Sequence, residues 1–279
     1  MQFKTINPPL PFWGNKKKMS KLFQQVILDN FDETNVYIDL FGGAGVLSKS
    51  IKTVYPTATV IYNDFDGYRN MCQHVDVLNV GLAIVKNTLV EFDQVRYYKI
   101  NQECRQMLIT QLSEWADLDN ADLYYSLIIS KLSFRNTSIN IKDKQQFIKA
   151  LNTHILYNNL CKVIYDVDNC MNYHKDLIIK NLDFRLLINE FKDNQKAVFI
   201  ADPPYTESTD SNYKNSFKLI DSLILYKDLK ELNSIIFCNE TTKIIDYVFN
   251  KCFFKEGSIA YESKQTFNPH GLEYMIVNK

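Results

Sequence analysis

The sequence of 279 residues predicts an α/β protein: a parallel sheet interrupted by a mainly helical insert. An apolar strand at 36–40 passes through a glycine-rich turn into a helix and then into a second strand at 59–63. Such a strand–helix–strand unit implies parallel strands with a right-handed crossover. Two more apolar segments of this kind, at 198–201 and 234–240, extend the predicted sheet late in the chain.

The middle of the chain has a different composition. From residue 67 to residue 169 there is no proline, and there are two glycines. Apolar residues recur there at helical spacing, in 121–134 and 145–164. We therefore predict a first domain formed by 1–66 and 170–279, with a helical insert at 67–169.

The predicted first domain is completed by segments that follow the insert. A short strand at 177–179 and a helix come directly after it. The segments 257–267 and 273–279, separated by a turn around residues 269–271, have the pattern of a closing pair of strands. The predicted sheet is therefore complete only at the end of the chain.

The composition is typical of a soluble globular protein, with 46% hydrophobic and 23% charged residues. No apolar run approaches the roughly 18 residues of a membrane span, and the N-terminus lacks the pattern of a signal peptide. The six cysteines and four histidines are scattered without close pairs, unlike a disulfide scaffold or a metal site. The sequence thus predicts a cytoplasmic protein with no metal ion and no membrane partner.

Charge is balanced overall, with 32 basic and 32 acidic residues. Two stretches are locally basic: residues 1–31 hold five lysines against one aspartate, and residues 131–149 hold five basic residues against one aspartate. Such a run is most often a solvated face, but contact with nucleic acid requires only a local patch. The charge pattern alone leaves both interpretations open.

Three polar or glycine-rich motifs follow predicted strands, where ligands bind in parallel sheets. The first, DLFGGAG at 39–45, contains glycines that allow backbone to approach a ligand closely. Asp64, in the second motif, follows Gly45 by 19 residues (64 − 45), near the spacing at which an acid meets ribose hydroxyls. Ser48 stands where the dinucleotide fingerprint has its third glycine, so a tight strand–helix turn is an equal interpretation.

The third motif, DPPY at 202–205, answers a specific chemical need. The amine of a nucleobase is conjugated with its ring and is a poor nucleophile. A carboxylate that accepts one N–H, together with a backbone carbonyl that accepts the other, makes the nitrogen more reactive. Asp202 supplies the carboxylate and Pro203 the carbonyl, Pro204 stiffens the backbone, and Tyr205 offers a face on which a base can stack. The plain alternative is a proline-bounded turn.

The order of these motifs resembles that of Dam-type DNA adenine-N6 methyltransferases over nearly the whole chain. The matching segments are PFWGNKKKM at 11–19, YIDLFGGAGVLS at 37–48, YNDFD at 62–66, NLDF at 181–184 and ADPPY at 201–205. The resemblance implies a Rossmann-like, S-adenosylmethionine-dependent methyltransferase sheet, whose insert recognises the target in double-stranded DNA. It further implies methyl transfer to adenine N6 by direct in-line displacement, with base flipping and without a metal.

The resemblance also implies a cofactor site. Its residues are Phe12, Lys16, Phe41, Gly42, Gly43, Asp64, Asp183, Phe184 and Asp202. Lys16 would lie near the carboxylate of S-adenosylmethionine, and the segment 41–43 would shape the pocket for its methionine part. Asp64 would accept from the ribose hydroxyls, while Asp183 and Phe184 would contact the adenine ring. The implied catalytic residues are Asp202, Pro203, Pro204 and Tyr205.

The DNA-binding residues are expected in the insert and in the loop after the catalytic motif. They are Lys131, Arg135, Asn136, Tyr213 and Lys214. Residues 133–147 resemble the recognition hairpin of the family, but its terminal Pro-Phe-Gly is missing. The usual GATC target of the family is therefore not assigned to this chain.

Three other functions remain alternatives at the sequence level. An N4-cytosine DNA methyltransferase faces the same amine chemistry but more often has serine in place of Asp202. A DNA-binding protein that has lost catalysis is disfavoured by the intact motif at 202–205, and a nicotinamide-dependent oxidoreductase by the incomplete glycine fingerprint. These residues identify neither a partner restriction endonuclease nor an oligomeric state.

Overall fold

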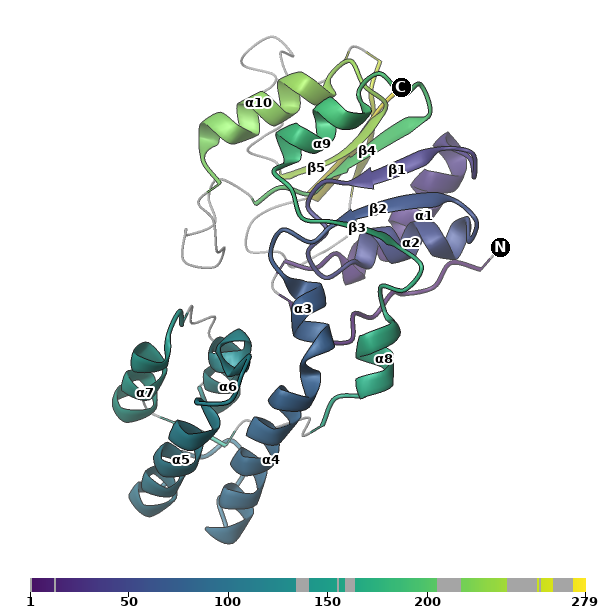
Figure 1. The fold of residues 1–279 in the computed structure, drawn as a ribbon. Coiled ribbons are helices and arrows are strands. Elements are labelled where there is room, and N and C mark those ends of the chain that lie inside the picture. Colours follow the sequence, from purple (N-terminus) through teal and green to yellow (C-terminus); the bar gives the residue numbers. More distant parts are fainter. Residues whose placement is uncertain are drawn as a thin grey trace. The chain divides into compact units, whose positions relative to one another are not determined.

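The computed structural model describes residues 2–12, 14–133, 141–154, 156–158, 164–204, 217–239, 255, 257–262 and 273–279 (Figure 1). The chain forms two compact units. The first comprises Met1–Tyr68 and His174–Lys279, and we call it the sheet unit. The second comprises Arg69–Tyr173, and we call it the helical unit.

The described part of the sheet unit contains a seven-stranded sheet with the strand order β3-β2-β1-β4-β5-β7-β6. Its strands are β1 (Val36–Asp39), β2 (Thr59–Asn63), β3 (Ile178–Lys180), β4 (Ala197–Ala201), β5 (Ser234–Asn239), β6 (Ile259–Glu262) and β7 (Glu273–Asn278). The first five are parallel, whereas β7 runs antiparallel to both β5 and β6. This mostly parallel, Rossmann-like sheet confirms the predicted α/β class.

Helices cover both faces of the sheet (Figure 1). On one side lie α1 (Ser20–Asn30) and α2 (Val46–Val54), and on the other lie α9 (Phe184–Phe191) and α10 (Leu219–Leu229). A short turn of 3-10 helix, η1 (Lys17–Met19), precedes α1. Burial on both faces explains why the central strands read as continuous apolar runs rather than alternating ones.

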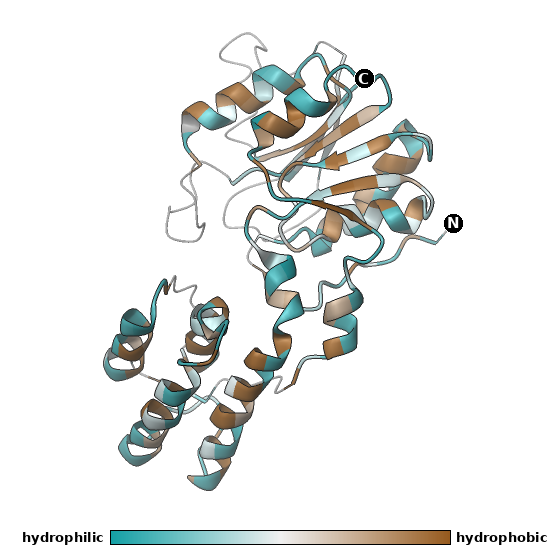
Figure 2. Cartoon of the chain, viewed as in Figure 1, coloured by the Kyte–Doolittle hydropathy of each residue, from teal (hydrophilic) through white to brown (hydrophobic). Residues whose placement is uncertain are grey.

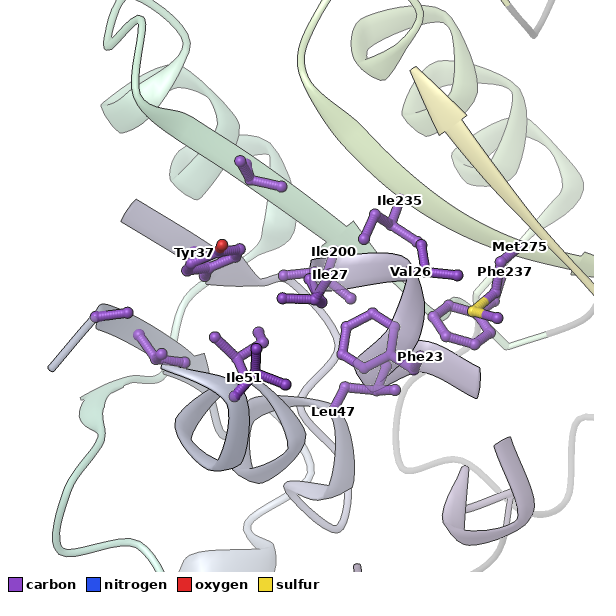
Figure 3. Packing of buried hydrophobic residues seen from close by; sticks show 14 of the residues in the cluster. Phe23, Val26, Ile27, Tyr37, Leu47, Ile51, Ile200, Ile235, Phe237 and Met275 are labelled. Atoms are coloured by element: carbon purple, nitrogen blue, oxygen red, sulfur yellow. The ribbon is translucent and has the colours of Figure 1, made fainter. Parts of the chain in front are cut away.

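Successive strand residues enter opposite cores. In β1, Tyr37 packs with α1 and α2, whereas Ile38 packs with α9 and α10. Figure 3 shows the first core, in which Phe23 of α1 and Ile51 of α2 meet the sheet. The apolar sides of these helices also appear in Figure 2. The sheet is therefore fixed between two independent apolar layers.

The helical unit is built from helices. They are α3 (Tyr68–Gln73), whose first residue belongs to the sheet unit, α4 (Val75–Glu91), α5 (Gln102–Trp115), η2 (Ala121–Tyr124), α6 (Tyr125–Leu132), α7 (Lys144–Thr153) and α8 (Val167–Asn172). Aromatic rings join several of them: Tyr125 and Phe147 stack at 4.6 Å, and Trp115 lies 5.9 Å from Phe147. Among the residues described, no helix is long and apolar enough to cross a membrane.

The helical spacing predicted through residue 164 ends earlier in the structure. After Thr153 the backbone turns extended, and Tyr157 forms a bridge with Lys99. Arg105 of α5 donates to the carbonyl oxygens of Leu151 and His154 at 2.7–3.0 Å. The guanidinium of Arg105 thus satisfies carbonyl groups at the C-terminal end of α7 that would otherwise lack a donor. The helix ends there, although apolar residues recur at helical spacing beyond this point.

The chain passes from one unit to the other at two points that are fixed within the sheet unit. Tyr68 and His174 pack edge to face, with ring centroids 5.8 Å apart. The hydroxyl of Tyr68 accepts from the amide of Leu10 at 2.9 Å and donates to its carbonyl at 2.8 Å. Tyr68 is therefore held against the N-terminal segment, and His174 packs against Tyr68.

Replacing Gly81 by alanine should destabilise the helical unit. Glycine to alanine in a helix normally stabilises by about 1 kcal/mol. Here the new Cβ would lie 2.7 Å from Cε2 of Trp115, whose indole nitrogen donates to the Val77 carbonyl at 2.9 Å. We expect the free energy of unfolding in urea to fall by about 1–3 kcal/mol. Asn87→Ala, at an exposed position of the same helix, is the control. If Gly81→Ala were as stable as the wild type or more stable, the close packing of Gly81 on Trp115 would be contradicted.

A candidate active site at the carboxyl edge of the sheet

A cavity of about 170 Å³ lies where β1, β2 and β4 end. The chain continues from β1 to β2 on one side, while β4 pairs with β1 on the other. Such a reversal of strand order is where open α/β sheets bind ligands. Of the residues predicted for the site, the cavity is lined by Phe12, Lys16, Phe41, Gly42, Gly43, Asp183, Phe184, Asp202 and Pro204.

The glycine-rich turn is closed tightly around the end of β2. A Cβ on Gly42 would overlap the ring of Tyr62 and lie 2.9 Å from the carbonyl oxygen of Asn63. Gly43 has a φ of 46°, and a Cβ there would lie 3.0 Å from Cε1 of Phe12. Glycine is thus required both by the turn and by the ring that lies over it. The two interpretations of the motif, tight turn and ligand site, are compatible.

Asp64 lies beside this turn but is not among the lining residues. Its buried carboxylate is 3.1 Å from the hydroxyl of Tyr62, which donates to the Gly43 carbonyl at 2.6 Å. Its neighbours Phe65 and Asp66 line the cavity instead. The acid predicted to bind ribose is therefore adjacent to the glycines, and its role stays a prediction.

One wall of the cavity is aromatic. Phe41 and Phe184 lie 5.5 Å apart between ring centroids, and Phe217 meets Phe41 edge to face at the same distance. Phe184 is buried in the sheet core as well as lining the cavity. This wall can pack against a flat, apolar ligand group.

Acidic groups stand next to the aromatic wall. Asp183 caps α9 by accepting from the Arg185 amide at 2.9 Å, and its second oxygen binds the Arg185 guanidinium at 2.9 Å. Arg185 also pairs with Asp221 of α10. Both aspartates line the cavity, so hydrogen-bond acceptors border the aromatic rings on this side.

A nearly buried charge cluster forms the other wall. The ammonium of Lys16 lies 2.8 Å from Oδ1 of Asp202 and 3.5 Å from Oε1 of Glu273. Burial raises the pKa of Asp202 to about 6; the charge and hydrogen bond of Lys16 lower it, and the charge of Glu273 raises it further. A carboxylate of this kind accepts a proton more readily than an ordinary aspartate.

A second carboxylate, Asp39, is buried at the end of β1. The hydroxyl of Ser48 donates to its Oδ2 at 2.7 Å. Burial raises the pKa of Asp39 to about 7, with the hydrogen bond from Ser48 opposing this and the charge of Asp202 adding to it. Two carboxyl groups with raised pKa values therefore interact at this edge of the sheet.

The predicted cofactor residues other than Asp64 all line the cavity. Pro203 is buried beside the cavity. Lys131 is half-buried at the end of α6 in the helical unit. The residues that lie outside the described part of the chain are Tyr205, Arg135, Asn136, Tyr213 and Lys214.

Sequence reasoning missed several residues of the site. They are Asp39, Phe65, Asp66, Leu182, Arg185, Phe217, Asp221 and Glu273. Two of them carry a readable signal: Asp39 directly precedes the glycine turn, and Glu273 begins an apolar strand. Phe65, Asp66 and Leu182 belong to motifs that follow β2 and β3, whereas Arg185, Phe217 and Asp221 reach the cavity because α9 and α10 pack on the sheet.

No family model matches the chain. A protein of Haemophilus influenzae named "Putative methyltransferase" is 28% identical to it over 245 residues, which cover 86% of this chain and 78% of that protein. The similarity supports a methyltransferase family. The aligned region includes residues of both units. The similarity supports the interpretation that this chain is an enzyme that transfers methyl groups.

Replacing Asp39 by asparagine should change how stability depends on pH. The pKa of Asp39 is raised from 3.8 to about 7 in the folded protein, so the stability it contributes is present below about pH 4 and is lost as the pH rises through 7. Asparagine does not titrate. Between about pH 5 and pH 8 the variant should therefore gain about 2 kcal/mol of unfolding free energy relative to the wild type.

Urea unfolding at the two pH values measures this difference. Asp228→Asn, at an exposed position of α10, is the matched control and should follow the wild type at both pH values. An unchanged pH dependence in Asp39→Asn would contradict a raised pKa at this position.

Proposed function

We propose that this protein is a DNA methyltransferase that transfers the methyl group of S-adenosylmethionine to the N6 amine of adenine in double-stranded DNA. The observation that carries the proposal is the carboxylate of Asp202, which enters the cavity at the end of β4 and is followed by two prolines. The similarity to a methyltransferase supports the reaction class, and the motif at 202–205 supports an amine as the acceptor.

The cavity has groups that suit S-adenosylmethionine. Two glycines leave a cradle that a Cβ would fill, and aromatic rings with adjacent acids border it. Lys16 would hold the cofactor carboxylate, Asp64 the ribose hydroxyls, and Asp183 with Phe184 the adenine ring. When bound, S-adenosylmethionine supplies a methyl group on a positively charged sulfur.

The residues of the chain would position and activate the target amine. Asp202 accepts one N–H of the adenine amine, and the carbonyl of Pro203 accepts the other. Pro204 has no N–H and restricts the backbone of Pro203, so that carbonyl keeps a fixed direction. This arrangement favours attack by the nitrogen lone pair through positioning and electrostatics.

Methylation leaves the nitrogen with one proton too many. Bound S-adenosylmethionine would supply the methyl carbon to N6 and would be left as the neutral thioether. Asp202 would accept the released proton, because its pKa of about 6 is above that of an ordinary aspartate. Asp202 thus serves first as a hydrogen-bond acceptor and then as a base.

Recognition of DNA is assigned to the helical unit and to the loop after the catalytic motif. The basic stretch 131–149 supports this assignment. Arg135 and Asn136 are proposed to contact bases or phosphates, and Lys131 to contact phosphate. Tyr213 and Lys214 are proposed to approach the flipped base.

Replacing Asp202 by asparagine should abolish methylation. Asparagine keeps the size of the side chain but cannot accept the proton, so the methylation rate should fall at least 100-fold or so. The measurement is incubation with unmethylated genomic DNA and S-adenosylmethionine, followed by digestion to nucleosides and mass spectrometry. The wild type should form N6-methyladenine, and Asp228→Asn should match the wild type.

Each result of that measurement has a defined meaning. Near-wild-type turnover in Asp202→Asn would overturn the role of this carboxylate. N4-methylcytosine from the wild type would replace adenine by cytosine as the acceptor. No modified base, with the cofactor still bound in calorimetry, would overturn DNA as the substrate.

Replacing Asp64 by asparagine should weaken binding of S-adenosylmethionine more than binding of DNA. A lost hydrogen bond between a carboxylate and the ribose is worth about 1.5–3 kcal/mol, which is roughly a 10- to 100-fold loss of affinity. Calorimetry with the cofactor and a fluorescence-anisotropy titration with a DNA duplex measure the two affinities. Equal losses in both titrations would contradict the ribose assignment.

A further inference from the structure

The last strand of the sheet brings an additional acid to the site. Glu273 is the first residue of β7 and is in register with Asn239, the last residue of β5. Because β7 is antiparallel, its first residue lies at the edge where the parallel strands end. The carboxylate of Glu273 reaches Lys16 there, at 3.5 Å.

Lys16 is shared between two carboxylates. Its ammonium lies between Asp202 and Glu273, also lies 3.4 Å from the Gly14 carbonyl, and stands over the ring of Phe237. The three charged side chains are only 8–15% exposed. One ammonium would neutralise Asp202 alone, and a second buried carboxylate is costly unless it has a task.

We infer that Glu273 is a positioning residue for methyl transfer, which holds the ammonium of Lys16 beside Asp202 while Asp202 exchanges partners. This inference rests on the proposed function. Without Glu273, the ammonium of Lys16 would lose one of its two described carboxylate partners, and its contact with Asp202 would compete more strongly with the target amine for the same oxygen. With Glu273 present, Lys16 keeps an anionic partner when Asp202 turns to the amine.

The same contact matters after the methyl group has moved. The proton leaves N6 for a carboxylate oxygen of Asp202, which makes Asp202 neutral. Lys16 then keeps the carboxylate of Glu273 as a protein partner, in addition to the cofactor carboxylate that it is proposed to hold. The proton passes on to water and Asp202 regains its charge, which completes the cycle without any further reactant.

Among the described residues, the charged groups that act on Asp202 are Lys16, Glu273 and Asp39. Lys16 precedes η1 and lowers the pKa of Asp202, whereas Glu273 on β7 raises it. Asp39 on β1 interacts with Asp202 electrostatically. The charge of Glu273 raises the pKa of Asp202. We therefore expect the pKa of Asp202 to fall when this charge is removed and Lys16 and Asp39 are left unchanged.

The first test needs neither DNA nor cofactor. In protein labelled with ¹³C at aspartate carboxyl groups, the Asp202 signal is assigned by its absence from Asp202→Asn. Its titration should move by about one pH unit to lower pH in Glu273→Gln. Glu273→Asp should titrate near the wild type, and Glu262→Gln at an exposed position of β6 is the control. Identical titration of Asp202 in the wild type and Glu273→Gln would overturn the inference.

The second test measures methylation across pH. In Glu273→Gln we expect kcat to fall about tenfold, with KM for DNA changed less than twofold, because an amine–carboxylate contact of the reacting complex is weakened. The acid limb of the kcat profile should move to lower pH, and Glu273→Asp should restore part of kcat. If Glu273→Gln had the same kcat and the same pH profile of kcat as the wild type, the inference would be overturned.

The two tests separate this inference from the proposed function. A wild type that methylates no DNA overturns the substrate, whereas the titration of Asp202 still decides whether Glu273 controls that carboxylate. If Glu273→Gln does not fold, Glu273→Asp carries the kinetic measurement. Its shorter side chain should weaken the contact with Lys16 and lower kcat by part of the expected tenfold, and a wild-type kcat in Glu273→Asp would then count against a role for Glu273.

Discussion

The buried pair between Lys16 and Asp202 is the constraint on which the rest of the site depends. It joins the beginning of the chain to the end of β4, and a buried ammonium must stay paired. The N-terminal segment has little regular structure, so side chains hold it in place. Gln24 of α1 exchanges two hydrogen bonds with the backbone of Lys4, at 2.7 and 3.1 Å. Phe12, which lies over the glycine turn, packs edge to face on Tyr68, with ring centroids 5.4 Å apart.

Much of the sheet could be predicted from sequence because its strands are short apolar runs bounded by turns and acids. The range 59–63 coincides with β2, and 36–40 ends one residue beyond β1. The glycine turn and Asp202 were readable for a related reason: chemistry at strand ends requires particular residue types at fixed spacing. Glu273 was visible as the start of a strand, but its contact with Lys16 depends on an antiparallel pairing that periodicity does not reveal.

Other features depend on contacts between segments far apart in sequence. The apolar period from 145 to 164 predicts a continuous helix, yet Arg105 ends α7 by binding its last carbonyls. Phe217 and Asp221 enter the site because α10 packs against the sheet, which no local pattern indicates. Phe184 has two roles at once, in the core and on the cavity wall. Local sequence patterns thus led to residues that line the cavity, whereas tertiary packing adds Phe217 and Asp221 to its lining.

The contact between Tyr68 and His174 has a consequence for how such chains can diversify. Because the insert leaves and re-enters the sheet unit at two touching side chains, its length and sequence are nearly decoupled from the sheet that surrounds them. A short linker between these positions would close the sheet unit as one chain, and an insert of another length could be joined at the same two residues. Recombination between these two positions would exchange one helical unit for another and leave the residues at the edge of the sheet unchanged.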